Sequence, residues 1–164
     1  MGRVQISMAS SGCLIVKKQN SEIVIRSIYP CLWFDGRAQE AAEFYCHIFP
    51  NSKMIESTEL VVRFELNGQW FMGLNGGPMF TFNEAVSFVV ECNSQEEIDY
   101  YWGELSSGGS TSQCGWLKDR FGVSWQIVPS ILSSLMANPD TATKTMKRFM
   151  SMTKFDIAQL LADD

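Results

Sequence analysis

The chain has 164 residues and a mass of 18.5 kDa, with 46% hydrophobic and 19% charged residues. This composition is typical of a globular domain and excludes an extensively disordered chain. The formal net charge of −5 argues against a nucleic-acid partner, which would require a basic face. No apolar run is long enough to cross a bilayer, so we expect neither a nucleic acid nor a membrane as a partner.

The five cysteines are widely spaced and form no C-x-x-C pair. An odd number of isolated cysteines predicts free thiols rather than a disulfide framework or a zinc knuckle. The apolar segment near the N-terminus is too short and too polar for a signal peptide. These features together predict a cytoplasmic protein.

Residues 1–26 alternate weakly between apolar and polar positions, and we expect a leader or extra strands there. Strong order begins with an aromatic-rich strand predicted over 28–34. Asp35 is then expected to act as the N-cap of a helix over 37–49. The stretch 53–65 favours β-structure, and Asn67-Gly68 between two apolar runs predicts a hairpin.

The same order of elements returns after residue 78. A strand over 86–90 precedes a capping box of Ser94 and Glu97, which begins a helix that ends at Gly108-Gly109. Strand-like segments follow at 111–117 and 123–128. The sequence therefore predicts an α+β domain over 27–164. Two βαβββ modules, about 26–82 and 83–129, would form a curved, mainly antiparallel sheet trough, followed by a helical tail over 130–164.

Four segments carry a resemblance to a known family: PCLWFDG at 30–36, AAEFY at 41–45, LNGGP at 74–78 and CGWLKDRFGVSWQIVP at 114–129. They resemble the PhnB-like branch of the vicinal oxygen chelate superfamily, also labelled 3-demethylubiquinone-9 3-methyltransferase-like. The superfamily includes glyoxalases, bleomycin resistance proteins and extradiol dioxygenases. Compared with that family, the loop before Leu60 is short, which predicts that the first module lacks a strand turn.

The resemblance also implies where a metal would bind. By pattern, the ligand positions of the superfamily fall on Tyr29, Ser87 and Gln126, with a fourth near Gly73 or Leu74. None of these is His, Asp or Glu, the ligands that a catalytic divalent ion requires, so we expect no metal. The glycine-rich segment 73–77 is not followed by a convincing helix, unlike a nucleotide-binding loop, so we expect no cofactor either.

Strand alternation selects the side chains that face the trough. Their aromatic, thiol and polar groups suit a small, partly apolar ligand. Trp33 is expected to stack on that ligand, and Gln126 to orient it through its amide. The full set of candidate ligand-binding residues is Tyr29, Cys31, Trp33, Asn75, Ser87, Glu91, Cys114, Trp116 and Gln126.

Three functions remain open at this point, and no catalytic residue is assigned. The preferred hypothesis is a protein that binds a small molecule without a catalytic metal. One alternative is an enzyme, either the methyltransferase of the family label or a metal-independent lyase or isomerase. The other is a structural or interaction module whose trough is filled. Since an open sheet leaves strand edges that a second copy can cover, as in relatives with this fold, we also expect a homodimer.

Overall fold

The computed structural model describes residues 5–8, 14–18, 21–25 and 27–162. The chain divides into two compact units, Met1–Pro30 and Cys31–Asp164. The first unit contains an antiparallel sheet of three short strands in chain order: β1 (Gln5–Met8), β2 (Leu14–Lys18) and β3 (Ser21–Ile25).

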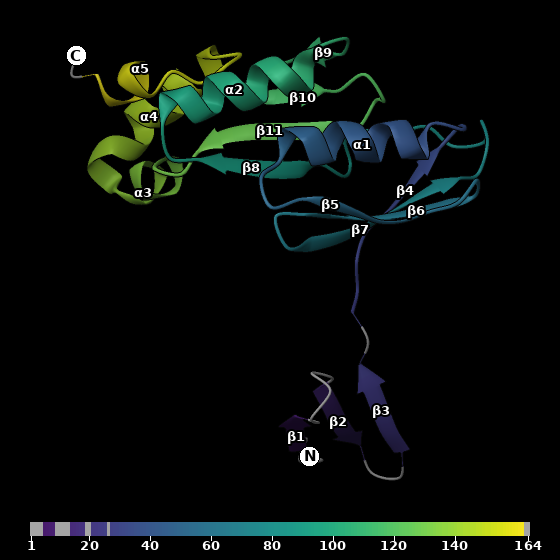
Figure 1. Ribbon diagram of the computed structural model, residues 1–164. Coiled ribbons are helices and arrows are strands. Elements are labelled where there is room, and N and C mark those ends of the chain that lie inside the picture. Colours follow the sequence, from purple (N-terminus) through teal and green to yellow (C-terminus); the bar gives the residue numbers. More distant parts are fainter. Residues whose placement is uncertain (1–4, 9–13, 19–20, 26, 163–164) are drawn as a thin grey trace. The chain divides into compact units, whose positions relative to one another are not determined.

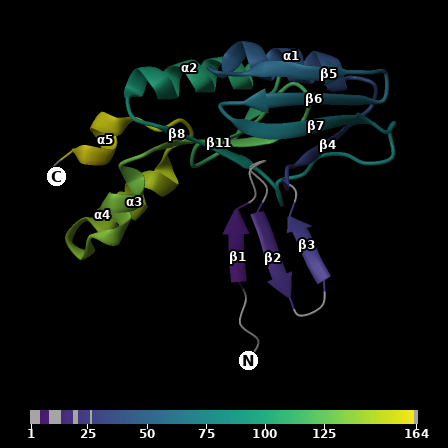
Figure 2. The same ribbon diagram turned by 60° about the horizontal axis from the view of Figure 1, so that its bottom comes forward.

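The second unit is built from two four-stranded sheets, shown in Figures 1 and 2. Their strand orders are β4-β7-β6-β5 and β8-β11-β10-β9, and in each sheet the first strand of the module pairs in parallel with the last. These are the two βαβββ modules of an α+β fold, as the sequence predicts. The first contains β4 (Cys31–Phe34), α1 (Ala38–Ile48), β5 (Lys53–Ser57), β6 (Val61–Leu66) and β7 (Gln69–Asn75). The second contains β8 (Phe88–Cys92), α2 (Gln95–Ser106), β9 (Ser110–Thr111), β10 (Trp116–Lys118) and β11 (Ser124–Pro129).

The helical tail comprises α3 (Leu132–Ala137), α4 (Pro139–Ser151) and α5 (Ile157–Leu161). The segment between α4 and α5 docks on the second module, because the carbonyls of Met152 and Thr153 accept hydrogen bonds from the N–H groups of Cys114 and Gly115. Phe155 is fully buried beside Gly115. No helix in the described part of the chain is long and apolar enough to span a membrane.

Two local signals in the sequence are confirmed. Asn67 and Gly68 connect β6 to β7 with φ angles of 45° and 85°, the left-handed pair that a tight hairpin turn requires. At the start of α2 the Ser94 hydroxyl accepts from the Glu97 N–H at 3.3 Å, and the Glu97 carboxylate accepts from the Asn93 N–H at 2.6 Å.

Asp35 as the N-cap of α1 is a wrong prediction. The N-cap position falls on Arg37, whose side chain makes no capping hydrogen bond. The Asn75 side chain, at the end of β7, accepts from the Ala38 N–H at 2.9 Å instead. A residue distant in sequence thus supplies the acceptor that the helix start requires.

The predicted loss of a strand turn before Leu60 is also wrong. β5 ends at Ser57 and β6 begins at Val61, so the first module has its full set of strands. Thr58 closes the short connection: its N–H donates to the Val61 carbonyl and its hydroxyl accepts from the Val61 N–H, both at 2.9 Å.

The two helices cover one side of each sheet, with α1 on the first sheet and α2 on the second (Figures 1 and 2). Trp125 and Ile127 of β11 are buried on this side, as strand alternation predicts, and so is Val123, which precedes the strand. Tyr45 of α1 reaches across to Trp125, with ring centroids 5.4 Å apart. The helix-covered sides of the two modules therefore share one aromatic core.

The carboxylate of Asp119 lies at the centre of this core, with an exposed fraction of 3%. One oxygen accepts from the Tyr45 hydroxyl at 2.7 Å and from the Trp125 indole N–H at 2.8 Å. The other accepts from the N–H groups of Phe121 and Val123. Burial raises the pKa of the Asp119 carboxyl, and these hydrogen bonds oppose that rise. Asp119 thus links α1 of the first module to the β10–β11 turn of the second.

We expect Asp119→Ala to lower the free energy of unfolding by about 3–5 kcal/mol, because the change leaves several buried donors unpaired. Tyr45→Phe removes one donor only and should cost about 1 kcal/mol. Urea unfolding monitored by circular dichroism measures both. The exposed Asp35→Ala is the matched control, with a change within about 0.5 kcal/mol. Equal effects of Asp119→Ala and Asp35→Ala would contradict a central role for the buried carboxylate.

Candidate functional site

The side of the second sheet that faces away from α2 carries a group of polar and aromatic side chains. Trp116 and Lys118 alternate on β10 with the buried Leu117. In the sheet register Trp116 lies opposite Gln126, and Lys118 lies opposite Ser124. Cross-strand partners present their side chains on the same face, so these four residues share the open face.

A pocket of about 380 Å³ opens on this face beside Trp116, Lys118 and Ser124. Ser124 is 1% exposed, and its hydroxyl is the one buried side-chain polar atom without a hydrogen-bond partner among the described residues. An unpaired buried hydroxyl is costly, so it marks a position where a ligand atom or a water is needed. The remaining lining residues are Glu84, Ser110, Ser112, Gln113 and Leu117.

Lys118 separates this pocket from a second one of about 310 Å³, which Trp33 and Phe80 line. The Lys118 ammonium pairs with the Glu84 carboxylate at 2.6 Å. The hydrogen bond from Lys118 lowers the pKa of Glu84, so the carboxylate is ionised at neutral pH. Lys118, whose charge Glu84 neutralises, therefore lies between the pocket beside Trp116 and the pocket beside Trp33.

Ser87 and Gln126 come together on the open face, but they bind each other. The Gln126 amide donates to the Ser87 hydroxyl at 2.9 Å. These are two of the positions where the superfamily pattern would place metal ligands, and neither side chain is an imidazole or a carboxylate. The described residues hold no group of three or more His, Cys, Asp or Glu side chains able to hold a metal ion. The donor set at this place does not fit a catalytic divalent ion.

Trp33 and Asn75 make contacts within the first module. The Trp33 indole N–H donates to the Gly77 carbonyl at 2.8 Å, and its ring packs against Phe80 with centroids 4.9 Å apart. A Cβ at Gly76 would lie 2.2 Å from the Trp33 ring, so only glycine fits there. Asn75 holds the start of α1 and also donates to the Glu59 carbonyl. The glycine-rich segment thus positions the Trp33 ring, which lines the second pocket together with Lys118.

Of the remaining predicted residues, Cys31, Cys114 and Glu91 do not line the Ser124 pocket. Cys31 is exposed at the start of β4, an edge strand of the first sheet. Cys114 lies in the turn beneath the tail, with its sulfur 3.6 Å from the Phe149 carbonyl, and burial raises the pKa of its thiol. Glu91 lines a separate crevice. Tyr29 belongs to the first unit, whereas the open face belongs to the second.

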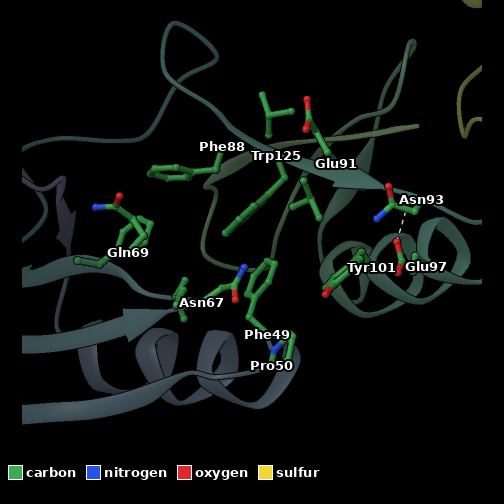
Figure 3. A pocket seen from close by; sticks show the side chains of 14 residues that line it. Phe49, Pro50, Asn67, Gln69, Phe88, Glu91, Asn93, Glu97, Tyr101 and Trp125 are labelled. Atoms are coloured by element: carbon green, nitrogen blue, oxygen red, sulfur yellow. Dashed lines mark hydrogen bonds between the residues drawn. The ribbon is translucent and has the colours of Figure 1, made fainter. Parts of the chain in front are cut away.

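That crevice, shown in Figure 3, has a volume of about 580 Å³ and lies between the β6–β7 hairpin and β8. Its floor is aromatic: Phe49 stacks on Trp125 and on Tyr101, each with centroids 5.3 Å apart. Glu97 already accepts a hydrogen bond from the Asn93 N–H, drawn as a dashed line in Figure 3. The buried hydroxyl of Ser124, which lacks a partner, does not line this crevice, so we prefer the open face as the candidate site.

Sequence reasoning missed Lys118, Glu84 and Ser124 as site residues. Ser124 belongs to the face that strand alternation selects, so part of the signal was present. The register that sets Lys118 opposite Ser124 and the turn that brings Glu84 to Lys118 are tertiary features. They leave no local pattern in the sequence.

Comparison with known proteins finds relatives of the same architecture. The model of a family described as 3-demethylubiquinone-9 3-methyltransferase matches residues 26–128. The PhnB protein from Bacillus cereus is 32% identical, with a TM-score of 0.59 over 64% of this chain and 100% of that chain. Protein PA1353 from Pseudomonas aeruginosa is 21% identical, with a TM-score of 0.53 over 64% and 98% of the two chains.

A more distant similarity is to the fosfomycin resistance protein FosX from Listeria monocytogenes, solved with Mn(II) and a sulfate ion. It is 15% identical, with a TM-score of 0.51 over 76% of this chain and 99% of that chain. Likeness to PA1353 and to FosX concerns the fold alone. No match is found among curated proteins.

We expect Ser124→Ala to raise the free energy of unfolding by about 1 kcal/mol, because it removes a buried hydroxyl that lacks a partner. Ser94→Ala, at a serine whose hydroxyl caps α2, should instead lower it by about 1 kcal/mol. Urea unfolding of the two variants beside the parent protein measures both signs. A loss of stability on Ser124→Ala would show that the hydroxyl is satisfied in the free protein.

Proposed function

We propose a ligand-binding function for this chain, which belongs to the 3-demethylubiquinone-9 3-methyltransferase family, the PhnB-like branch of the vicinal oxygen chelate superfamily. The protein binds a small, partly apolar molecule on the open face of the second sheet, without a catalytic metal. The flat part of the molecule stacks on Trp116, and a polar atom pairs with the Ser124 hydroxyl.

The observation that carries this proposal is the unpaired, buried hydroxyl of Ser124 beside a partly exposed tryptophan in one pocket. A buried polar atom left without a partner reduces stability, whereas a ligand atom there would form a hydrogen bond in surroundings of low dielectric constant. Trp116 adds an apolar surface that a flat molecule can cover. A pocket with one aromatic wall and a few polar groups is typical of small-molecule sites.

The family description names a methyltransferase, but the glycine-rich segment does not fit a nucleotide-type cofactor. Anion-binding loops of that kind lead into a helix whose N-terminus faces the anion. Here the segment after β7 has no helix before β8, and the Trp33 ring occupies the space beside Gly76. We therefore assign no methyl-transfer step to this chain, and an enzymatic role remains the second candidate.

The proposal is tested with 2-naphthamide, a flat neutral probe with a polar group that can donate and accept. Titration followed by ¹H–¹⁵N NMR should shift the indole N–H resonance of Trp116. Trp116→Ala should weaken binding by about 1–2 kcal/mol through loss of the stacking surface. Ser124→Ala should weaken it by about 1 kcal/mol through loss of the hydrogen bond.

Trp70→Ala is the matched control, because Trp70 is 39% exposed on β7 and lines none of the pockets described above. Its affinity for 2-naphthamide should equal that of the parent protein. Equal losses in the Trp116 and Trp70 variants, or no loss in either, would refute binding at the open face.

We also propose that two copies of the chain pair in solution. β8 is an edge strand of the second sheet, and Val89 on it is 56% exposed, as is the nearby Val86 at 70%. A partner would cover this apolar edge. Light scattering should give twice the mass of one chain, and Val89→Lys should shift the protein toward monomer. A monomeric parent protein at working concentration contradicts this proposal.

A further inference from the structure

Lys118 is the only basic residue among the described residues that line the Ser124 pocket, and it also lines the adjoining pocket beside Trp33. Its side chain is 35% exposed, so it is accessible from solvent. Ser110 and Ser124 lie opposite it on the two neighbouring strands. Lys118 therefore lies between two serine-bearing strands, at the boundary between two cavities that are each lined by a tryptophan.

The partner of Lys118 comes from outside the sheet. Glu84 belongs to the segment 76–87, which connects the modules without helix or strand, and it sits in a turn where the Ala85 N–H donates to the Asn83 side chain. Its side chain is 62% exposed, yet its carboxylate lies 2.6 Å from the Lys118 ammonium. A surface ion pair of this kind contributes little to stability, so its loss is readily compensated.

Arg37 is the other cation near the Trp33 pocket, and it is engaged differently. Its Nε and one terminal nitrogen donate to the Glu40 carboxylate at 2.9 and 2.7 Å, and the other terminal nitrogen donates to the Arg120 carbonyl at 3.4 Å. Its guanidinium also lies 4.5 Å from the centroid of the Phe121 ring. Lys118 is thus the cation that can exchange its partner without loss of a bidentate pair.

We propose that the ligand of the open face is an organic anion, and that Glu84 is an internal competitor which the anionic group of the ligand displaces from Lys118. This inference rests on the proposed function and names its ligand class: a flat apolar body with one carboxylate-like group. The body stacks on Trp116, the Ser124 hydroxyl donates to the ligand, and the ligand anion takes the place of the Glu84 carboxylate.

The alternatives fit the pocket less well. A neutral ligand would leave the ion pair in place and use only Trp116 and Ser124. A cationic ligand would meet the Lys118 ammonium and would have to separate Glu84 from it. An anion keeps Lys118 paired throughout. Its hydrogen bond with the Lys118 ammonium is charge-assisted and is therefore stronger than the hydrogen bond of a neutral ligand.

The test compares 2-naphthoate with 2-naphthamide, which have the same ring and differ in charge. Calorimetric titration should show that the carboxylate binds at least about tenfold more tightly, the factor expected for a hydrogen bond to a charged group. Lys118→Met should remove that preference and leave 2-naphthamide binding unchanged within about twofold.

Glu84→Gln should strengthen 2-naphthoate binding at least about threefold, since the competing charge is gone. It should leave 2-naphthamide binding unchanged. Glu104→Gln on α2 is the matched control, because it removes the same charge from an exposed glutamate that does not line this pocket, and it should have no effect on either probe.

The possible failures are distinguishable. If 2-naphthamide binds in a Trp116-dependent way but 2-naphthoate binds no more tightly, or if Glu84→Gln leaves its affinity unchanged, the anion inference is overturned and the proposed function stands. If neither probe responds to Trp116→Ala, the proposed function falls, and the anion inference falls with it.

Discussion

The buried carboxylate of Asp119 is the constraint on which the arrangement of the two modules depends. It accepts hydrogen bonds from Tyr45 of the first module and from Trp125 of the second, while the N–H groups of its own turn occupy its other oxygen. The rings that it fixes continue the core, since Tyr45 also stacks on Phe64. A charge so deeply buried is tolerated only with this set of donors. The helix-covered sides of both sheets therefore form one closed core, and the opposite sides are available for binding.

The open face of the second sheet differs from that core in how its polar groups are satisfied. In the core the Asp119 carboxylate receives four donors, whereas on the open face the Ser124 hydroxyl has no partner. Lys118, opposite Ser124, pairs with Glu84 of the connecting segment. Incomplete satisfaction reduces the stability of a free protein, and such positions concentrate where a ligand completes them. The contrast between the two faces is the physical reason to place binding on the open one.

The architecture could be predicted from the sequence because its signals are local. The Asn67-Gly68 turn and the Ser94 capping box each need only a few neighbouring residues, and both are confirmed. The Asp35 cap failed because the acceptor for α1 comes from Asn75, which is close in space and distant in sequence. The site was predicted less completely for the same reason. Strand alternation placed Ser87 and Gln126 on the trough face, and Trp116 was a further candidate, but the partners of these residues depend on register and on a connecting turn.

Membership of the vicinal oxygen chelate superfamily defines where chemistry can be placed on this fold, but not which chemistry it is. At the positions where the superfamily pattern would place metal ligands, Gln126 donates to Ser87, so these two side chains satisfy each other. What remains on the face is a lysine with an exchangeable partner, an unpaired hydroxyl and an indole ring. These groups can hold a molecule by charge, by hydrogen bonding and by stacking, and none of these interactions requires a bound metal ion. We therefore expect the specificity of this chain to depend on the neighbours of Lys118 on β9, β10 and β11, rather than on the positions that the superfamily pattern emphasises.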